Sequence, residues 1–156
     1  MLVAAGSLSK RYSTFGTING TLYFVRPMHM PKCEGNQTKY GLTFDITYLY
    51  GDTDSVSFTT TVVTSGKENL DSVLVKSKSG TIRAKTELIY REPHKSYYVN
   101  RIRFYIKWSE WKELYGSATP YVIEYGKRLR FSFKQKKWEK ESKTINDIMD
   151  IIETNK

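Results

Sequence analysis

The chain has 156 residues, enough for one domain with its own core and too few for two domains of ordinary size. It holds 25 Lys and Arg against 16 Asp and Glu, a formal charge of +9, which favours nucleic acid or acidic protein surfaces as partners and also provides solubility. Cys33 is the single cysteine, so an internal disulfide is excluded, and no stretch approaches the roughly 20 apolar residues of a membrane span. The first 15 residues lack the pattern of a signal peptide. We therefore expect a protein that folds in the cytoplasm, or within a particle assembled there, and that has no membrane partner.

Alternating side chains predict strands from the N-terminal part of the chain onward. "TFGTI" and "TLYFV" predict a hairpin whose two-residue turn is Asn19-Gly20, because both turn positions need positive φ. Residues 26–39 follow as a predicted loop, since they contain Pro27, Pro31 and Gly35.

The next two strands are predicted at 42–50 and 55–64, joined by a turn at 51–54. A short strand is expected at 72–77. The longest strands are expected at 81–91 and 97–108, with residues 92–96 between them.

The C-terminal third contains the predicted helices and one more hairpin. Residues 109–116 predict one or two helical turns that end at Gly116, and residues 121–125 and 128–134 predict a hairpin around Gly126-Lys127. In "TINDIMDIIE" the apolar residues follow helical spacing, and Thr144 with Asp147 resembles a capping box.

These elements predict one all-β domain, a mainly antiparallel sandwich or a jelly-roll-like barrel of about eight or nine strands, with a C-terminal helix. The β domain is expected over 1–136, and a charged bridge followed by the amphipathic helix over 137–156.

One short motif concerns catalysis. The six residues 50–55, "YGDTDS", resemble the metal-binding signature of family B DNA polymerases, in which aspartates on a hairpin hold magnesium. That resemblance would assign metal ligands to Asp52 and Asp54. The chain has no second aspartate in that family's D-x-x-S-L-Y-P pattern and no nucleotide-binding helix, and two carboxylates alone make a poor Ca²⁺ or Mg²⁺ site. We interpret the segment as the turn of a tight hairpin.

Two further candidates contain histidine. Met28, His29, Met30 and Cys33 are soft ligands of the kind that suits Cu(I), but no second cluster completes a site. His94 lies in a Pro-containing turn without a neighbouring nucleophile. We therefore expect no cofactor, no metal site and no enzyme activity.

The positive charge is concentrated on predicted strands. Residues 101–143 hold 12 Lys and Arg against 5 Asp and Glu, a net charge of +7. If 92–96 closes a simple hairpin, Glu87 lies opposite Arg101 and Lys85 opposite Arg103, and the second pair needs an anion or an acidic partner to neutralise it. Cations beside tyrosine are typical of single-stranded nucleic-acid binding, although a solvated sheet face that resists aggregation explains them too. The predicted basic face consists of Arg83, Lys85, Arg101, Arg103, Tyr105, Lys107, Arg128 and Arg130.

The terminal helix is the second candidate contact. Its stripe of Ile145, Ile148, Met149 and Ile152 packs either on the parent sheet or on a neighbouring subunit. A small Tyr-rich β domain with a terminal arm is how many accessory subunits of large assemblies, virus particles included, are built. The expected function is therefore that of a non-catalytic assembly subunit that binds other protein subunits as part of an oligomer. The alternative is a single-stranded nucleic-acid-binding protein that uses the basic face.

Overall fold

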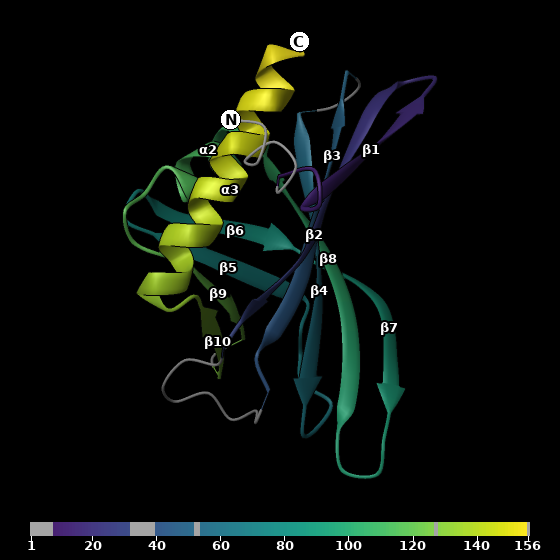
Figure 1. Ribbon diagram of the computed structural model, residues 1–156. Coiled ribbons are helices and arrows are strands. Elements are labelled where there is room, and N and C mark those ends of the chain that lie inside the picture. The colour runs from purple at the N-terminus through teal and green to yellow at the C-terminus, as the bar shows by residue number, and fades with distance from the viewer. Residues whose placement is uncertain (1–7, 32–39, 52–53, 127, 156) are drawn as a thin grey trace.

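A computed structural model describes residues 8–31, 40–51, 54–126 and 128–155 (Figure 1). These residues form ten strands, which are β1 (Tyr12–Thr17), β2 (Gly20–Met30), β3 (Leu42–Tyr50), β4 (Ser55–Thr64), β5 (Ser72–Ser77), β6 (Gly80–Lys85), β7 (Glu87–Pro93), β8 (Tyr98–Lys107), β9 (Val122–Tyr125) and β10 (Leu129–Ser132). The helices α2 and α3 span Trp108–Tyr115 and Gln135–Thr154.

The strands form two antiparallel sheets. The six-stranded sheet has the order β1-β2-β3-β4-β8-β7, and the four-stranded sheet has the order β10-β9-β5-β6. The prediction of an antiparallel all-β fold with a C-terminal helix is confirmed, in its sandwich form. The structure has one strand more than the predicted maximum because the segment predicted as a single strand over 81–91 contributes to both sheets.

The core lies between the two sheets. The ring of Phe58 stacks on those of Phe44 and Phe104, at centroid distances of 5.7 and 5.1 Å. The hydroxyls of Thr60 and Tyr125 lie 2.7 Å apart and join the six-stranded sheet to the four-stranded sheet by a buried hydrogen bond. A polar link of this kind fixes the position of one layer relative to the other, since both hydroxyls would otherwise be buried without a partner.

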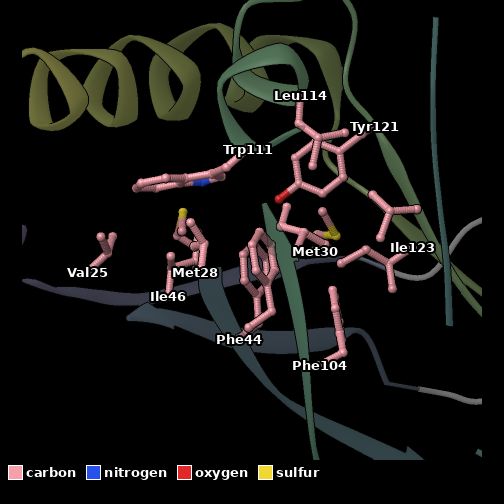
Figure 2. Close-up of a cluster of buried hydrophobic side chains, with 14 of the residues drawn as sticks. Val25, Met28, Met30, Phe44, Ile46, Phe104, Trp111, Leu114, Tyr121 and Ile123 are labelled. Atoms are coloured by element: carbon pink, nitrogen blue, oxygen red, sulfur yellow. The ribbon is translucent and has the colours of Figure 1, made fainter. Parts of the chain in front are cut away.

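The helices cover the part of the inner face that the four-stranded sheet leaves open (Figure 1). Figure 2 shows the indole ring of Trp111, from α2, lying over Val25, Met28 and Ile46 of β2 and β3. All four side chains are 3% exposed or less. No helix in the described parts of the chain has the length and the apolar composition needed to cross a membrane.

The extended segment 80–93 changes sheets at Thr86. β6 pairs with β5 and β7 pairs with β8, while Thr86 donates its backbone N–H to Asp71 O (3.1 Å) and its hydroxyl to Leu70 O. The prediction of one strand is wrong at this point. Leu88 and Tyr90 are 52% and 46% exposed because β7 is an edge strand beyond the cover of the four-stranded sheet.

The first hairpin also differs from the prediction. Its turn is Ile18-Asn19, since Thr17 pairs with Gly20, and Gly20 has φ of +146°. Strand β2 continues to Met30, so the predicted loop over 26–39 is wrong as far as residue 30, and residues 32–39 lie outside the described parts. The pairing with β3 shifts between Val25 and Met28, a bulge that accommodates Pro27, which has no N–H to donate.

Helix α3 begins well before the predicted start at Thr144. The segment predicted as a charged bridge, 137–143, is helical, and the Thr144 hydroxyl donates to Lys140 O (3.2 Å) inside the helix instead of capping its end. Trp138 is buried, and the nearly buried Glu141 forms an ion pair with Arg11. Both residues continue the apolar stripe by one further turn or more, which explains the longer helix.

Other predicted elements are confirmed. Strands β3 and β4 form a hairpin, as do β9 and β10, and Gly126 turns the second one with φ of +61°. Helix α2 makes about two turns and ends at Gly116, whose N–H bonds to Lys112 O.

Candidate interaction surface

Strand β8 presents an ordered row of side chains on the outer face of the six-stranded sheet, the face directed away from the core. Ile102, Phe104 and Ile106 are buried, and their neighbours along the strand alternate with them. The outward row consists of Arg101, Arg103, Tyr105 and Lys107, as predicted. In Figure 1 the helices and the four-stranded sheet lie on the opposite side of this sheet.

The rest of the predicted basic face lies elsewhere. Arg83 and Lys85 are on β6, Arg130 is on β10 and Arg128 is in the turn before β10, so all four belong to the four-stranded sheet. The outer faces of two packed sheets point in opposite directions. The eight residues therefore do not form one surface.

The predicted pairing of like charges is absent. Glu87 of β7 lies opposite Arg103, and Tyr90 lies opposite Arg101, while Lys85 pairs with Ser72 of β5 in the other sheet. The hairpin prediction placed Lys85 opposite Arg103 because it took 81–91 as one strand, and the change of sheet at Thr86 removes that pairing.

The arginines of β8 differ in how their charge is neutralised. Arg101 donates to Asp45 Oδ2 and to Thr61 Oγ1, at 2.7 and 2.8 Å. Nε of Arg103 is shielded from solvent without a hydrogen-bond partner in the described structure, and Oε2 of Glu87 lies 3.9 Å from it, beyond hydrogen-bond length. Arg103 thus has one guanidinium nitrogen without a hydrogen-bond partner among the described residues, on the strand next to the edge of the sheet.

A trough on this outer face runs parallel to the strands, between Phe24 on one side and Tyr105 on the other. The register aligns Phe24, Thr47, Ser57 and Tyr105 in one row across β2, β3, β4 and β8. The two aromatic residues are 39% and 45% exposed and stand about 14 Å apart in backbone position, three strand spacings, above a floor of small hydroxyl side chains. The hollow has a volume of about 380 Å³, and Arg103 also lines it.

On the outer face of the four-stranded sheet, one carboxylate binds two of the cations. Glu124 of β9 is 9% exposed and forms ion pairs with Lys76 (2.7 Å) and Arg130 (2.8 Å). The carboxylate is therefore shared by cations on both neighbouring strands. Arg130, predicted to contact a partner, already has this carboxylate in the domain.

No protein-family model, no curated protein and no solved structure matches the chain. The function proposed below is argued from the geometry and chemistry of the described residues.

The soft-ligand candidate is not assembled in the described residues. Met28 and Met30 point into the core, whereas His29 lies on the other side of β2, 3.3 Å from Thr43 Oγ1, and Cys33 lies outside the described residues. Burial and the neighbouring Lys137 ammonium hold the pKa of His29 below its usual value.

Of the polymerase-like segment, Tyr50 ends β3 and Ser55 begins β4, while Asp52 and Thr53 are outside the described residues. The backbone carbonyl of Asp54 accepts a hydrogen bond from Trp108 N (2.8 Å), which ties the start of β4 to the start of α2. His94 stacks on Tyr97 at 4.6 Å in the β7–β8 turn. Within the described parts of the chain, no three His, Cys, Asp or Glu side chains are grouped to hold a metal ion.

The apolar stripe of α3 packs on its own domain. Ile145, Ile148, Met149 and Ile152 are each 1% exposed or less. Of the two alternatives that the sequence left open, the structure shows packing on the parent sheet, so these side chains are not on the surface of the chain.

Several exposed side chains were not predicted as candidates. Phe15 and Ile18, at the tip of the first hairpin, are 63% and 101% exposed, and Phe24 forms one wall of the trough. The available signal was the alternation in "TLYFV", where buried Tyr23 and Val25 place Phe24 on the opposite face.

Proposed function

We propose that the protein is a non-catalytic subunit of a larger protein assembly and that it contacts other subunits through the exposed surface of its six-stranded sheet. One observation carries this proposal. In the described residues, the exposed large apolar side chains all lie on strands of the six-stranded sheet or on the segments that bound them, and none lies on the four-stranded sheet, α2 or α3. They are Phe15, Ile18, Phe24, Tyr40, Leu88, Ile89, Tyr90 and Tyr105.

Concentration on one sheet distinguishes these side chains from the single apolar residues found on any protein surface. Aromatic residues and arginine are also the types enriched at protein interfaces, and Phe24, Tyr105 and Arg103 all line the trough. Where the facing surface of another subunit is locally acidic, the positive charge of this chain adds to the attraction.

The test is the size of the protein in solution, measured by light scattering together with absorbance at 260 nm. We expect an assembly of defined size without nucleic acid, which the double substitution Phe24→Asp and Tyr105→Asp makes smaller. Both side chains are exposed, so the variant is expected to fold. A matched control is Arg83→Asp with Lys85→Asp on the other sheet. A monomer that carries nucleic acid would contradict the proposal.

Single-stranded nucleic acid is the second candidate, supported by the row of Arg101, Arg103, Tyr105 and Lys107. A row of cations along a strand can bind the phosphate backbone of a nucleic acid, and an exposed aromatic ring beside the row can stack on a base. Binding to a labelled oligonucleotide should then weaken log-linearly with salt, and Arg103→Gln with Lys107→Gln should reduce the slope. The same changes at Arg83 and Lys85 should leave it unaltered. Absence of binding at low salt excludes this candidate.

A further inference from the structure

The two sheets have four edge strands, and they differ in how they are protected against pairing with another chain. Native edges usually carry charges, proline or bulges. Strand β7 has Glu87, Arg91, Glu92 and Pro93, and its pairing with β8 is interrupted by a bulge. The edges of the four-stranded sheet carry charge as well, from Arg83 and Lys85 on β6 and from Arg130 on β10.

Strand β1 has none of these protections. Its sequence, "YSTFGT", contains no charge and no proline, and its pairing with β2 is unbroken from Tyr12 to Thr17. All its residues after Tyr12 are exposed, and in the described structure β1 pairs with β2 alone. It lies at the free margin of the six-stranded sheet in Figure 1. An uncharged, regular, exposed edge is a template for another strand.

We propose that β1 pairs antiparallel with β1 of a second copy of this chain, so that two six-stranded sheets become one continuous sheet. This inference rests on the proposed function, because it names one contact of the assembly. The distribution of charge in the chain favours a second copy as the molecule that pairs with β1. Two molecules of net charge +9 repel each other, and from Tyr12 to Val25 the first hairpin contains no Asp, Glu, Lys or Arg. Like charges therefore do not meet in this contact.

Twofold symmetry and the side chains together select the register. In an antiparallel pair, opposed residues share a face, and a twofold axis places one residue opposite its own copy. With Phe15 at the axis, Ser13 lies opposite Thr17, and the fully exposed Ile18 meets Tyr12 of the other copy. Centring on Thr14 or on Gly16 would instead place Phe15 opposite a hydroxyl side chain, Ser13 or Thr17.

The register also continues an apolar row that exists in each copy. Phe15 lies opposite Leu22, and Leu22 lies opposite Leu49, all on the outer face. When two copies pair at Phe15, their two apolar rows join into one row of twice the length. The two Phe15 rings then form a cross-strand pair of aromatic residues, and such pairs stabilise a sheet. Because the axis is perpendicular to the sheet, both troughs lie on the same side of the joined sheet and are presented to a partner together.

Disulfide trapping tests the register. Phe15→Cys is introduced into a chain in which Cys33 is replaced by Ser, and the dilute protein is oxidised mildly. The predicted pair brings the two substituted positions within the Cα separation that a disulfide spans, so a covalent dimer is expected. Leu88→Cys, at the equally exposed edge strand β7, is the matched control and should remain monomeric under the same conditions.

Light scattering of the otherwise unmodified chain supplies the second measurement. The dimer fraction should rise with salt, because screening weakens the repulsion between two cationic copies. Phe15→Lys should raise the dimer dissociation constant about tenfold or more, and Leu88→Lys should leave it unchanged. Circular dichroism confirms that both variants fold.

The outcomes separate this inference from the proposed function. A chain that is monomeric at every salt concentration, or that forms disulfides equally at both substituted positions, overturns pairing through β1. If Phe15→Lys leaves an assembly intact while Phe24→Asp with Tyr105→Asp reduces its size, the outer-face contact stands and the edge contact is wrong. If Phe15→Lys reduces the size of the assembly while Phe24→Asp with Tyr105→Asp leaves it intact, pairing through β1 stands and the outer-face contact is wrong.

Discussion

Arg101 of β8 reaches across β4 to Asp45 of β3, where its Nη2 lies 2.7 Å from Oδ2. Both side chains are about one quarter exposed, and Thr61, on the strand between them, accepts a second bond from the same guanidinium. This bridge holds together three strands of the outer face, and it removes most of the charge of Arg101 from the surface offered to a partner.

Asp45→Asn should lower the free energy of unfolding by up to about 1 kcal/mol, since the ion pair is only partly shielded from water. Urea unfolding measures the change. Glu87→Gln is the matched control: its carboxylate is 63% exposed and 3.9 Å from Arg103, so a much smaller loss is expected. Equal losses in the two variants would contradict the structural role given to Asp45.

Thr86→Val should destabilise the fold at the point where the chain changes sheets. The substitution preserves shape but leaves the carbonyl of Leu70 without the hydroxyl that bonds to it, at a cost of about 1 kcal/mol. Thermal unfolding provides the measurement. Thr81→Val, on exposed β6, is the control, and if it lowers stability as much as Thr86→Val, the hydroxyl of Thr86 has no special role.

Gly20→Ala should be more harmful than Gly80→Ala. Both glycines have positive φ, +146° and +137°, but a Cβ on Gly20 would lie 1.8 Å from Tyr50 O, whereas Gly80 faces open space. Backbone strain is common to the two variants, and the clash should cost Gly20→Ala a further 1–3 kcal/mol, roughly. Denaturant unfolding of the two proteins side by side isolates that difference.

His29 should titrate below its ordinary pKa, because burial and the Lys137 ammonium both disfavour its charged form. The unfolded chain then binds the proton more readily, so this residue's contribution to stability is present above the unfolded pKa and is lost as pH falls through the titration. NMR titration of the imidazole measures the shift. Lys137→Gln should raise the pKa of His29 towards its ordinary value, and an unchanged pKa would exclude the lysine as a cause.

Three buried tyrosines should resist alkaline titration while the protein is folded. Burial is the main cause that raises the pKa values of Tyr115, Tyr121 and Tyr125. Their folded pKa values exceed the unfolded value, so stability from these groups is complete below about pH 10 and is lost as pH rises further. Absorbance at 295 nm should show these three phenols ionising only as near-ultraviolet circular dichroism is lost.

The alternation of apolar and polar side chains was sufficient to predict most strands and the outward row of β8, since this alternation depends only on the strand itself. It failed at Thr86 because an extended chain can pass from one sheet to another without interrupting its alternation. The only local signal there was a polar threonine in the register of Ile82, Ala84 and Leu88. The composition of the candidate surface was beyond sequence reasoning for the same reason, since which strands become neighbours is decided by pairing between distant segments.

The start of α3 was missed for a different reason. The segment 137–143 was interpreted as a charged bridge before the helix, although Lys and Glu are good helix formers. Trp138 and Glu141 occupy the phase of the apolar stripe, so an amphipathic pattern that allowed one aromatic residue and one paired carboxylate would have extended the helix correctly.

The order of the strands in the six-stranded sheet has a consequence for synthesis of the chain. Strands β4 and β8 are adjacent in space, yet β5, β6 and β7 are made between them. While the chain is being translated, β1 to β4 can already form a meander, and one of the two margins of that meander is β4, whose ten residues carry no charge. Strand β8, with Arg101 and Arg103, covers this margin only when about two thirds of the protein has been made. Until β8 has been made, the uncharged strand β4 is therefore open on one side, and a molecular chaperone or another nascent copy can bind to it.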